Sequence, residues 1–251
     1  AFPFKSKEKP RFKYESALTV IEPTVDQFPG SNTDYYAVQH WANLLDGGAS
    51  ITLVSRDSAI IEFGGLWPGY VSQAHHCLPT PQYGHDFLKP GSLEKGWMYS
   101  YILNGNFQTN FRSVQVSDCL FRYSLTSGNG DWRNGKAKDF GYSVCLPLET
   151  VYIKGPKDGL LPPTASFCCI EQPNVVLLTL KHAEDGDGLI LRLWESEGKD
   201  TTAVVHLPFL KIKEAWETNL VEENQRELPV QNPLVIPLKA YGVTSVRLRD
   251  V

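Results

Sequence analysis

Alternating apolar and polar residues recur in short stretches along the chain, and this period of two predicts β-strands. In Ile51–Val54, Ile51 and Leu53 face one way while Thr52 and Val54 face the other. The same alternation is present in Leu189–Trp194, Leu234–Leu238 and Val243–Arg249. The pattern therefore favours a fold built mainly from strands.

Two segments, one alternating and one mostly apolar, indicate where their strands lie in a sheet. Leu234–Leu238 alternates although Pro233 and Pro237 accompany it. Because proline cannot donate a ladder hydrogen bond, we expect an edge strand or a bulged strand there. Val175–Leu180 is apolar apart from Thr179, which is typical of a strand covered on both faces.

Clusters of turn-forming residues separate the apolar stretches, at 29–32, 46–48, 127–130 and 185–188. With 20 glycines and 17 prolines, most segments are too short for helices of ordinary length. This spacing predicts an all-β fold made of sandwiches rather than βαβ units. The Gly- and Pro-rich stretch 154–163 divides the chain. We expect a large β-sandwich domain over residues 1–165 and a small C-terminal β-sandwich domain over residues 166–251.

Two segments do not follow this pattern. Phe209–Leu228 contains no Gly or Pro, and its apolar spacing fits a helix about as well as two strands joined at Glu222–Asn224. Gly64–Gly96 is dense in Gly, Pro, His and aromatic residues and has little periodicity. A loop of that length within a compact domain is usually functional or forms an interface.

Composition and charge narrow the possible functions. A hydrophobic fraction of 42% and a charged fraction of 21% describe an ordinary globular protein. The formal net charge of −4 at pH 7, without a basic stripe, does not favour binding to nucleic acid or to an anionic membrane. The longest apolar runs are far shorter than the ~20 residues that cross a bilayer. We therefore expect neither a nucleic-acid nor a membrane partner.

The five cysteines form an odd and sparse set without CxxC spacing, which favours a reducing compartment, and we expect a cytoplasmic protein. Cys168 and Cys169 are flanked by apolar residues, so buried packing explains them better than a redox or ligand role. The chain begins at Ala1 and its only methionine is Met98. We interpret it as a processed or excised piece.

A histidine-rich stretch is the first candidate for chemistry. His75, His76 and His85, with Asp86, are residue types that hold transition metals. Their spacing matches no recognised zinc arrangement, and adjacent histidines on an extended chain point to opposite faces. We expect no metal site. A loop whose His75, His85 and Asp86 contact a sugar or a partner domain, or a solvated loop, fits better.

A polar and aromatic segment around Tyr99–Phe111 is the second candidate. Sugar sites combine amide and hydroxyl hydrogen bonds with aromatic faces that stack on the pyranose ring. The residues that we expect at a carbohydrate site are Trp97, Asn104, Asn106, Phe107, Thr109 and Asn110. The alternative is a turn built by asparagines between core aromatic residues.

Paired carboxylates are the third candidate, because a retaining glycosidase needs two carboxyl groups ~5–5.5 Å apart. Pairs that are close in sequence are Glu22/Asp26, Asp57/Glu62 and Glu222/Glu223, and none stands out. The chain also has no GxSxG, P-loop or GxGxxG motif. We therefore predict no catalytic residue here.

Several motifs follow one another in an order that is familiar. They are Ala1–Phe4, Glu22–Ser31, Tyr36–Trp41, Val54–Asp57, Leu103–Arg112, Phe121–Tyr123, Leu180–Gly186, Leu189–Leu193, Asn219–Glu222 and Ser245–Leu248. Their order resembles the C-terminal β-domains of glycoside hydrolase family 38, the α-mannosidases. Leu103–Arg112 with Phe121–Tyr123 is similar to the family pattern N-x-W-x-T-N-F…F-R-Y, with Phe107 where Trp is common. The resemblance covers nearly the whole chain through motifs that are individually of moderate specificity.

This resemblance implies a mutarotase-like supersandwich portion followed by a small sandwich, with Phe209–Leu228 as strand–turn–strand. In the family, an N-terminal barrel carries the zinc ion and the aspartate nucleophile, and a helical domain follows it. The resemblance therefore implies no cofactor in this chain and zinc in the missing barrel. The implied partners are the barrel, the helical domain and a mannoside. Gly64–Gly96 and Asn104–Asn110 would face the sugar pocket of the barrel.

We therefore expect a non-catalytic C-terminal β-domain of an α-mannosidase-like hydrolase, which shapes and supports the mannoside-binding site of a zinc-dependent barrel. A stand-alone carbohydrate-binding module is the first alternative. The second is a mutarotase- or epimerase-type enzyme that uses His75, His76 or His85 as acid and base.

Overall fold

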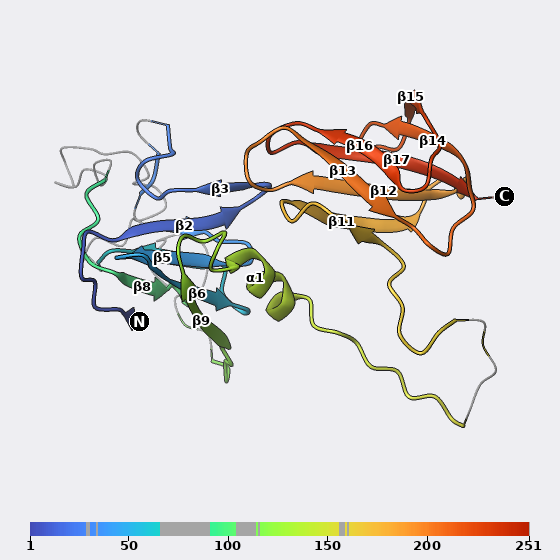
Figure 1. The fold of residues 1–251 in the computed structure, drawn as a ribbon. Coiled ribbons are helices and arrows are strands. Elements are labelled where there is room, and N and C mark those ends of the chain that lie inside the picture. The colour runs from blue at the N-terminus through green and yellow to red at the C-terminus, as the bar shows by residue number, and fades with distance from the viewer. Residues whose placement is uncertain are drawn as a thin grey trace. The chain divides into compact units, whose positions relative to one another are not determined.

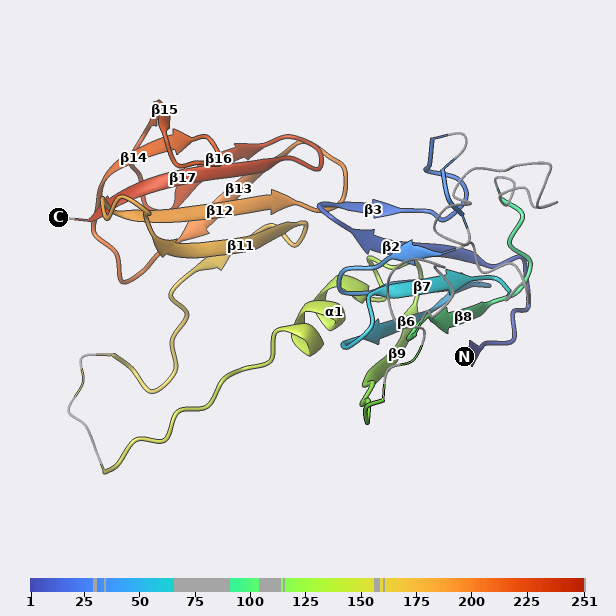
Figure 2. The same ribbon diagram turned by 180° about the vertical axis from the view of Figure 1, so that it is seen from behind.

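The computed structural model describes residues 1–28, 31–33, 35–65, 91–103, 114, 116–155, 159 and 161–250, as Figures 1 and 2 show. The chain forms two compact units, residues 1–150 and 151–251. The domain boundary that we expected at 165/166 lies further along the chain than the division between these units at 150/151. It stays a prediction. Among the described residues, no helix combines the length and the apolar character that a bilayer crossing requires.

In its described residues, the first unit contains two antiparallel sheets and one helix. Its elements are β1 (Phe2–Pro3), β2 (Arg11–Ser16), β3 (Thr19–Ile21), β4 (Tyr36–Ala37), β5 (Ala42–Asp46), β6 (Ala49–Ser55), β7 (Ile60–Phe63), β8 (Trp97–Ser100), β9 (Tyr123–Asn129) and α1 (Ala137–Cys145). The strand orders are β1-β8-β7-β4 and β3-β2-β5-β6-β9.

The two sheets of this unit share a core, as expected for a sandwich. Leu53 of β6 is buried with Phe63 and Met98 of the other sheet, and Ile51 packs against the same cluster. The predicted alternation of Ile51–Val54 is therefore confirmed. Val54, on the opposite face, is buried in a second cluster with residues of α1.

Helix α1 covers part of the outer face of the five-stranded sheet, and the sequence patterns did not predict it. Trp132, which precedes α1, stacks on Trp41 with ring centroids 5.2 Å apart. Gly141 lets the helix approach closely, since a Cβ atom there would lie 2.8 Å from Cδ1 of Trp41. Packing on Trp41, rather than helix propensity, thus holds this short helix in place.

A buried carboxylate also holds α1. Glu15 of β2 is 1% exposed, and its Oε1 accepts a hydrogen bond from the Tyr142 hydroxyl at 3.2 Å. The same oxygen lies 2.8 Å from Nδ1 of His40, whose ring is 4.2 Å from that of Tyr142. Burial, followed by the charge of Glu15, raises the pKa of Tyr142, so its hydroxyl remains a donor. We call Glu15, His40 and Tyr142 the Glu15 clamp.

The second unit is all β. Its strands are β10 (Cys169–Ile170), β11 (Val175–His182), β12 (Leu189–Glu195), β13 (Thr201–His206), β14 (Ile212–Thr218), β15 (Asn224–Leu228), β16 (Leu234–Leu238) and β17 (Val243–Asp250). They form a three-stranded sheet in the order β10-β13-β16 and a five-stranded sheet in the order β11-β12-β17-β14-β15. One cluster, which includes Leu191, Val205, Ile236 and Val246, joins the sheets into a sandwich. The all-β prediction is confirmed.

Three local predictions can be compared with this unit. Phe209–Leu228 forms β14 and β15, so the strand–turn–strand implied by the resemblance is confirmed. β16 lies at the edge of its sheet, as its prolines predicted. The prediction that Val175–Leu180 is covered on both faces is wrong. Its strand, β11, lies at an edge and leaves Leu177 38% exposed.

Candidate functional site

The outer face of the four-stranded sheet gathers aromatic side chains, and it is the candidate functional site of the first unit. β8 lies between β1 and β7, and its residues Trp97 and Tyr99 point to the same side because side chains alternate along a strand. Their ring centroids are 6.3 Å apart in an edge-on arrangement. Tyr99 is the cross-strand neighbour of Glu62, which is 7% exposed.

Two more tyrosines extend this face. The rings of Tyr35 and Tyr101 are 5.8 Å apart. Burial raises the pKa of Tyr101 to about 12, and the charges of Glu62 and Tyr35 add to this shift. Tyr101 therefore keeps its proton at neutral pH. We call Tyr35, Glu62, Trp97, Tyr99 and Tyr101 the aromatic face.

A lysine occupies part of the aromatic face. The ammonium group of Lys95 lies 4.3 Å from the ring centroid of Trp97, a cation–π distance. A pyranose ring that stacked on this side of the indole would have to displace Lys95. The face thus has the residue types of a sugar site, with its largest ring partly covered.

Trp97 is the one predicted carbohydrate-site residue that the structure describes. His75, His85, Asp86, Asn104, Asn106, Phe107, Thr109 and Asn110 lie outside the described residues, as do His76 and Cys77. Sequence reasoning missed Tyr35 and considered Glu62 only in a carboxylate pair with Asp57. Only the pairing of β7 with β8 brings Glu62 beside Tyr99. The alternate spacing of Trp97, Tyr99 and Tyr101 was a usable signal, since Trp97 and Tyr99 share a face of β8 and Tyr101 follows one residue after its end.

A cation bonds at least one carboxylate of each pair that the sequence offered, namely Glu22, Asp57 and Glu222. Arg122 hydrogen-bonds Asp57 through its side chain and its backbone, which lowers the pKa of Asp57 to about 2. The side chain of Arg11 likewise lowers the pKa of Glu22. Both carboxyl groups are thus ionised partners of arginine rather than proton donors.

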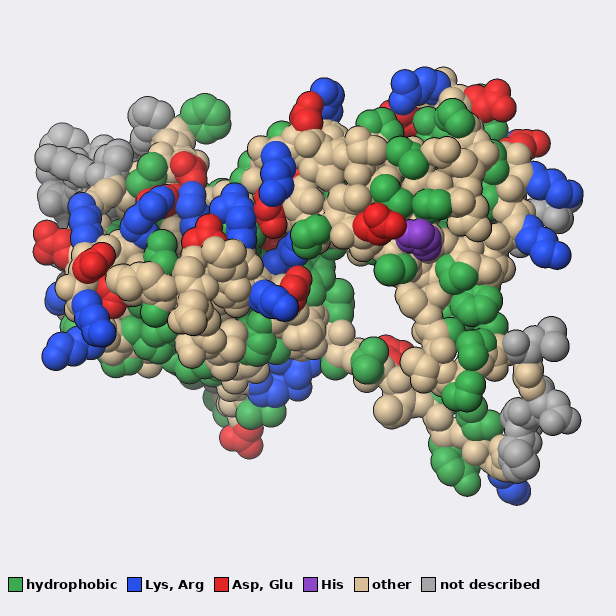
Figure 3. Space-filling model, viewed as in Figure 1, with side chains coloured by type: hydrophobic (Ala, Val, Ile, Leu, Met, Phe, Trp, Pro, Cys, Tyr) green, Lys and Arg blue, Asp and Glu red, His purple; other side chains and the backbone are tan. Residues whose placement is uncertain are grey.

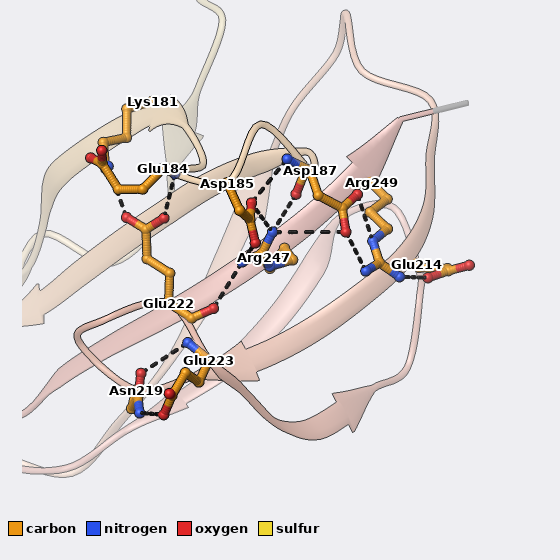
Figure 4. A network of polar contacts seen from close by, with 10 residues as sticks. All are labelled: Lys181, Glu184, Asp185, Asp187, Glu214, Asn219, Glu222, Glu223, Arg247 and Arg249. Atoms are coloured by element: carbon orange, nitrogen blue, oxygen red, sulfur yellow. Dashed lines mark hydrogen bonds and ion pairs between the residues drawn. The ribbon is translucent and has the colours of Figure 1, made fainter.

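A network of charged residues on the second unit forms the other candidate (Figure 4). At its centre is Arg247 of β17, whose side chain is 4% exposed. Nη1 and Nη2 donate to the two carboxylate oxygens of Asp185 at 2.8 and 2.9 Å. Nη2 also donates to the backbone oxygen of Glu222 at 2.8 Å. Arg247 therefore ties two loops, 183–188 and 219–223, to the sheet.

The remaining charges of this network are also paired. Lys181 lies 2.8 Å from Oε1 of Glu222, and this hydrogen bond is the main cause that lowers the pKa of Glu222. Arg249 bonds Asp187 and donates to Glu214 at 2.6 Å. A hollow of about 300 Å³ is lined by Glu184, Asp185, Asp187, Val221, Glu222, Glu223, Asn224, Arg247 and Arg249. Its charged groups bond one another, so we assign the network a structural role.

The described residues contain no group of three or more His, Cys, Asp or Glu side chains that could hold a metal ion. The acidic residues of the network do not form such a group, because their oxygens face Arg247, Arg249 and Lys181. These residues therefore do not fit a zinc site.

Comparison with known proteins shows which family this fold resembles. Residues 174–246 match the model described as "Glycosyl hydrolases family 38 C-terminal beta sandwich domain". The second unit is a family 38 C-terminal β-sandwich domain. The resemblance read from the sequence is thereby confirmed.

Solved structures extend the likeness in fold to the first unit. An alpha-mannosidase from Enterococcus faecalis V583 superposes with a TM-score of 0.59 and 16% identity, covering 98% of this chain and 25% of its own. A glycosyl hydrolase family 38 protein from Enterococcus faecalis gives a TM-score of 0.56 and 15% identity, covering 94% of this chain and 24% of its own. At such identities the likeness concerns the fold. The chain spans about a quarter of the length of these proteins. No curated protein matches its sequence.

Proposed function

We propose that this chain is a non-catalytic C-terminal β-domain of an α-mannosidase-like glycoside hydrolase, and that it supports the mannoside site of a catalytic barrel outside the chain. The observation that carries the proposal is the match of residues 174–246 to the family 38 C-terminal domain. The E. faecalis V583 alpha-mannosidase, which contains the fold of nearly this whole chain within a quarter of its length, supports it.

The protonation of the carboxyl groups also supports a non-catalytic role. A glycosidase needs one carboxylic acid whose pKa is raised so that it can protonate the leaving group. Among the described residues, every carboxyl group with a resolved pKa shift is shifted downward, and these are Glu22, Asp46, Asp57, Asp185, Glu195, Asp200 and Glu222. None of them suits the role of general acid.

An exposed apolar segment supports contact with further domains. Leu146, Leu148, Val151, Tyr152 and Ile153 are 61–98% exposed and lie outside any helix or strand. Figure 3 shows hydrophobic side chains following one another along the stretch after α1. Clustered exposed apolar residues mark surfaces that meet another protein surface. We propose that this segment packs against the barrel or helical domain of the parent protein.

In this proposal, zinc belongs to the barrel, and the residues that the structure describes in this chain do not fit a zinc site. The carbohydrate partner is a mannoside held by the whole enzyme. A cytoplasmic location is part of the proposal, and the four cysteines that the structure describes are free thiols.

An activity assay tests the proposal. The isolated chain is incubated with an aryl α-mannoside and zinc, and we expect no turnover above buffer. Turnover that survives purification and is abolished by Glu62→Gln or by another substitution in this chain would overturn the non-catalytic role.

The aromatic face supports a second candidate, a stand-alone carbohydrate-binding module. This candidate requires that the isolated chain bind mannosides or other glycans in calorimetric titrations and lose binding on Trp97→Ala. Lys95→Ala should then strengthen binding, because it uncovers the indole ring. Flat titrations for the unmodified chain and for Lys95→Ala would remove this candidate.

A further inference from the structure

A thiol, an imidazole and a carboxylate lie together on the outer face of the three-stranded sheet of the second unit. Cys169 of β10 is directly opposite His206 of β13, so their side chains share a face. Glu171 is two positions beyond Cys169, and its Oε1 lies 2.8 Å from Nε2 of His206. Cys169 is exposed, so the expectation that buried packing explains this cysteine is wrong. The side chains of His206 and Glu171 are 42% and 53% exposed.

The arrangement has the parts of an activated nucleophile. When Nε2–H of His206 donates to Glu171, the lone pair lies on Nδ1, the nitrogen nearer the backbone. Cross-strand neighbours have Cβ atoms about 4.5–5.5 Å apart. Rotation of Cys169 about its Cα–Cβ bond therefore brings the sulfur within reach of Nδ1. A thiol beside a base that a third group orients is the general signature of a reactive cysteine.

We propose that Cys169 is a reactive thiol that exchanges with small disulfides, with His206 as its base and Glu171 as the positioning residue. The Cys169 thiol gives its proton to Nδ1 of His206, and the thiolate attacks one sulfur of a low-molecular-weight disulfide. A new S–S bond forms at Cys169 while the old S–S bond breaks. The departing thiolate takes the proton from His206. Cys169 is oxidised and the departing half of the disulfide is reduced.

The mixed disulfide at Cys169 is long-lived, because the neighbouring Cys168 cannot reach it. Cys168 packs against the core of the sandwich, and burial raises the pKa of its thiol. Adjacent residues of an extended chain point to opposite sides, so Cys168 is not placed to resolve the mixed disulfide. The site thus holds the modification until an external thiol removes it.

The test is site-resolved labelling of the folded chain with Ellman's reagent, followed by peptide mass spectrometry. Cys119 is the internal standard, because it is also exposed and its sulfur contacts the backbone oxygen of Ser117. We expect Cys169 to react roughly tenfold faster than Cys119 or more. His206→Gln should bring its rate to that of Cys119, and Glu171→Gln should give an intermediate rate.

His182→Gln is the matched control, since His182 is an exposed histidine on another strand, β11. It should leave labelling unchanged, and melting curves of all variants should match that of the unmodified chain. A Cys169 rate no faster than that of Cys119, or a rate that His206→Gln leaves unchanged, would overturn the proposal.

Discussion

Arg247 and Asp185 form a two-pronged ion pair, with Nη1–Oδ1 and Nη2–Oδ2 distances of 2.8 and 2.9 Å. The pair is asymmetric, because the side chain of Arg247 is 4% exposed and that of Asp185 is 58% exposed. The buried arginine is therefore the anchor, and the aspartate is the part of a surface loop that it holds.

This asymmetry predicts which loops each substitution releases. Arg247→Met should speed backbone amide hydrogen exchange in both loops, 183–188 and 219–223. Each ~1.4 kcal/mol lost from the free energy of local opening speeds exchange about tenfold. Asp185→Ala should speed exchange in 183–188 alone, because Arg247 still donates to the backbone oxygen of Glu222. Equal effects of Asp185→Ala on both loops would show that Arg247 is not the anchor. Exchange followed by mass spectrometry measures this.

The Asp57–Arg122 pair predicts a loss of stability in acid. Its hydrogen bonds lower the pKa of Asp57 from 3.8 to about 2 in the folded protein. A carboxyl group with a depressed folded pKa stabilises the protein above its unfolded pKa, and this contribution disappears as the pH falls toward the folded value. The unmodified chain should exceed Asp57→Asn in Tm at pH 6. The gap should narrow between pH 4 and pH 2, and a gap independent of pH would contradict the assignment.

The close approach of Gly141 to Trp41 predicts that a side chain at position 141 destabilises the protein. Alanine favours a helix over glycine by up to ~1 kcal/mol, but its Cβ would lie 2.8 Å from Trp41. Because overpacking a core costs about 1–3 kcal/mol, we expect Gly141→Ala to lower the free energy of unfolding. Gly159→Ala is the control, since a Cβ there meets nothing within 4 Å. Urea denaturation followed by tryptophan fluorescence compares the two, and a stabilised Gly141→Ala would refute the close packing.

The hydrogen bonds of the buried Glu195 carboxylate predict a large loss of stability when its charge is removed. This carboxylate is 0% exposed and accepts bonds from Asn174 and from the backbone N–H groups of Glu197, Gly198, Lys199 and Tyr241. Burial alone would raise its pKa, but these donors outweigh burial and lower it.

Glu195→Gln places an NH₂ group among N–H donors, so we expect a loss of about 2–3 kcal/mol in the free energy of unfolding. Glu227→Gln, on the exposed surface of β15, should be near neutral. Chemical denaturation of both variants at pH 7 measures the difference. A Glu195→Gln variant as stable as Glu227→Gln would contradict the five bonds assigned to this carboxylate.

Local patterns predicted the strands well because alternation records which face meets the core. Leu191 and Leu193 are buried in the core as their spacing indicated. Ile190 and Trp194 are also buried, although they point to the opposite face. The sequence could not show this, because burial on that face depends on segments remote in the chain. For the same reason Val175–Leu180 was misread, since hydrophobicity does not reveal that a strand ends a sheet.

The candidate site was less accessible to sequence reasoning. Trp97 was identified by its chemistry, but Glu62 joins it only through the register of β7 and β8. The helix α1 was missed because its nine residues include Gly141, and its stability comes from contacts with Trp41. Arg247 was not identified from the sequence, because its partners lie in turns whose contacts with the strand the sequence does not show.

The Glu15 clamp joins residues that are 127 positions apart in the chain. During synthesis from the N-terminus, Glu15 and His40 leave the ribosome long before Tyr142. Until then the outer face of the sheet around Trp41 lacks its cover. The first unit therefore cannot reach its final stability as a nascent chain before α1 is complete. Contacts of such separation also slow refolding, so a chain truncated before α1 should be the species that chaperones retain.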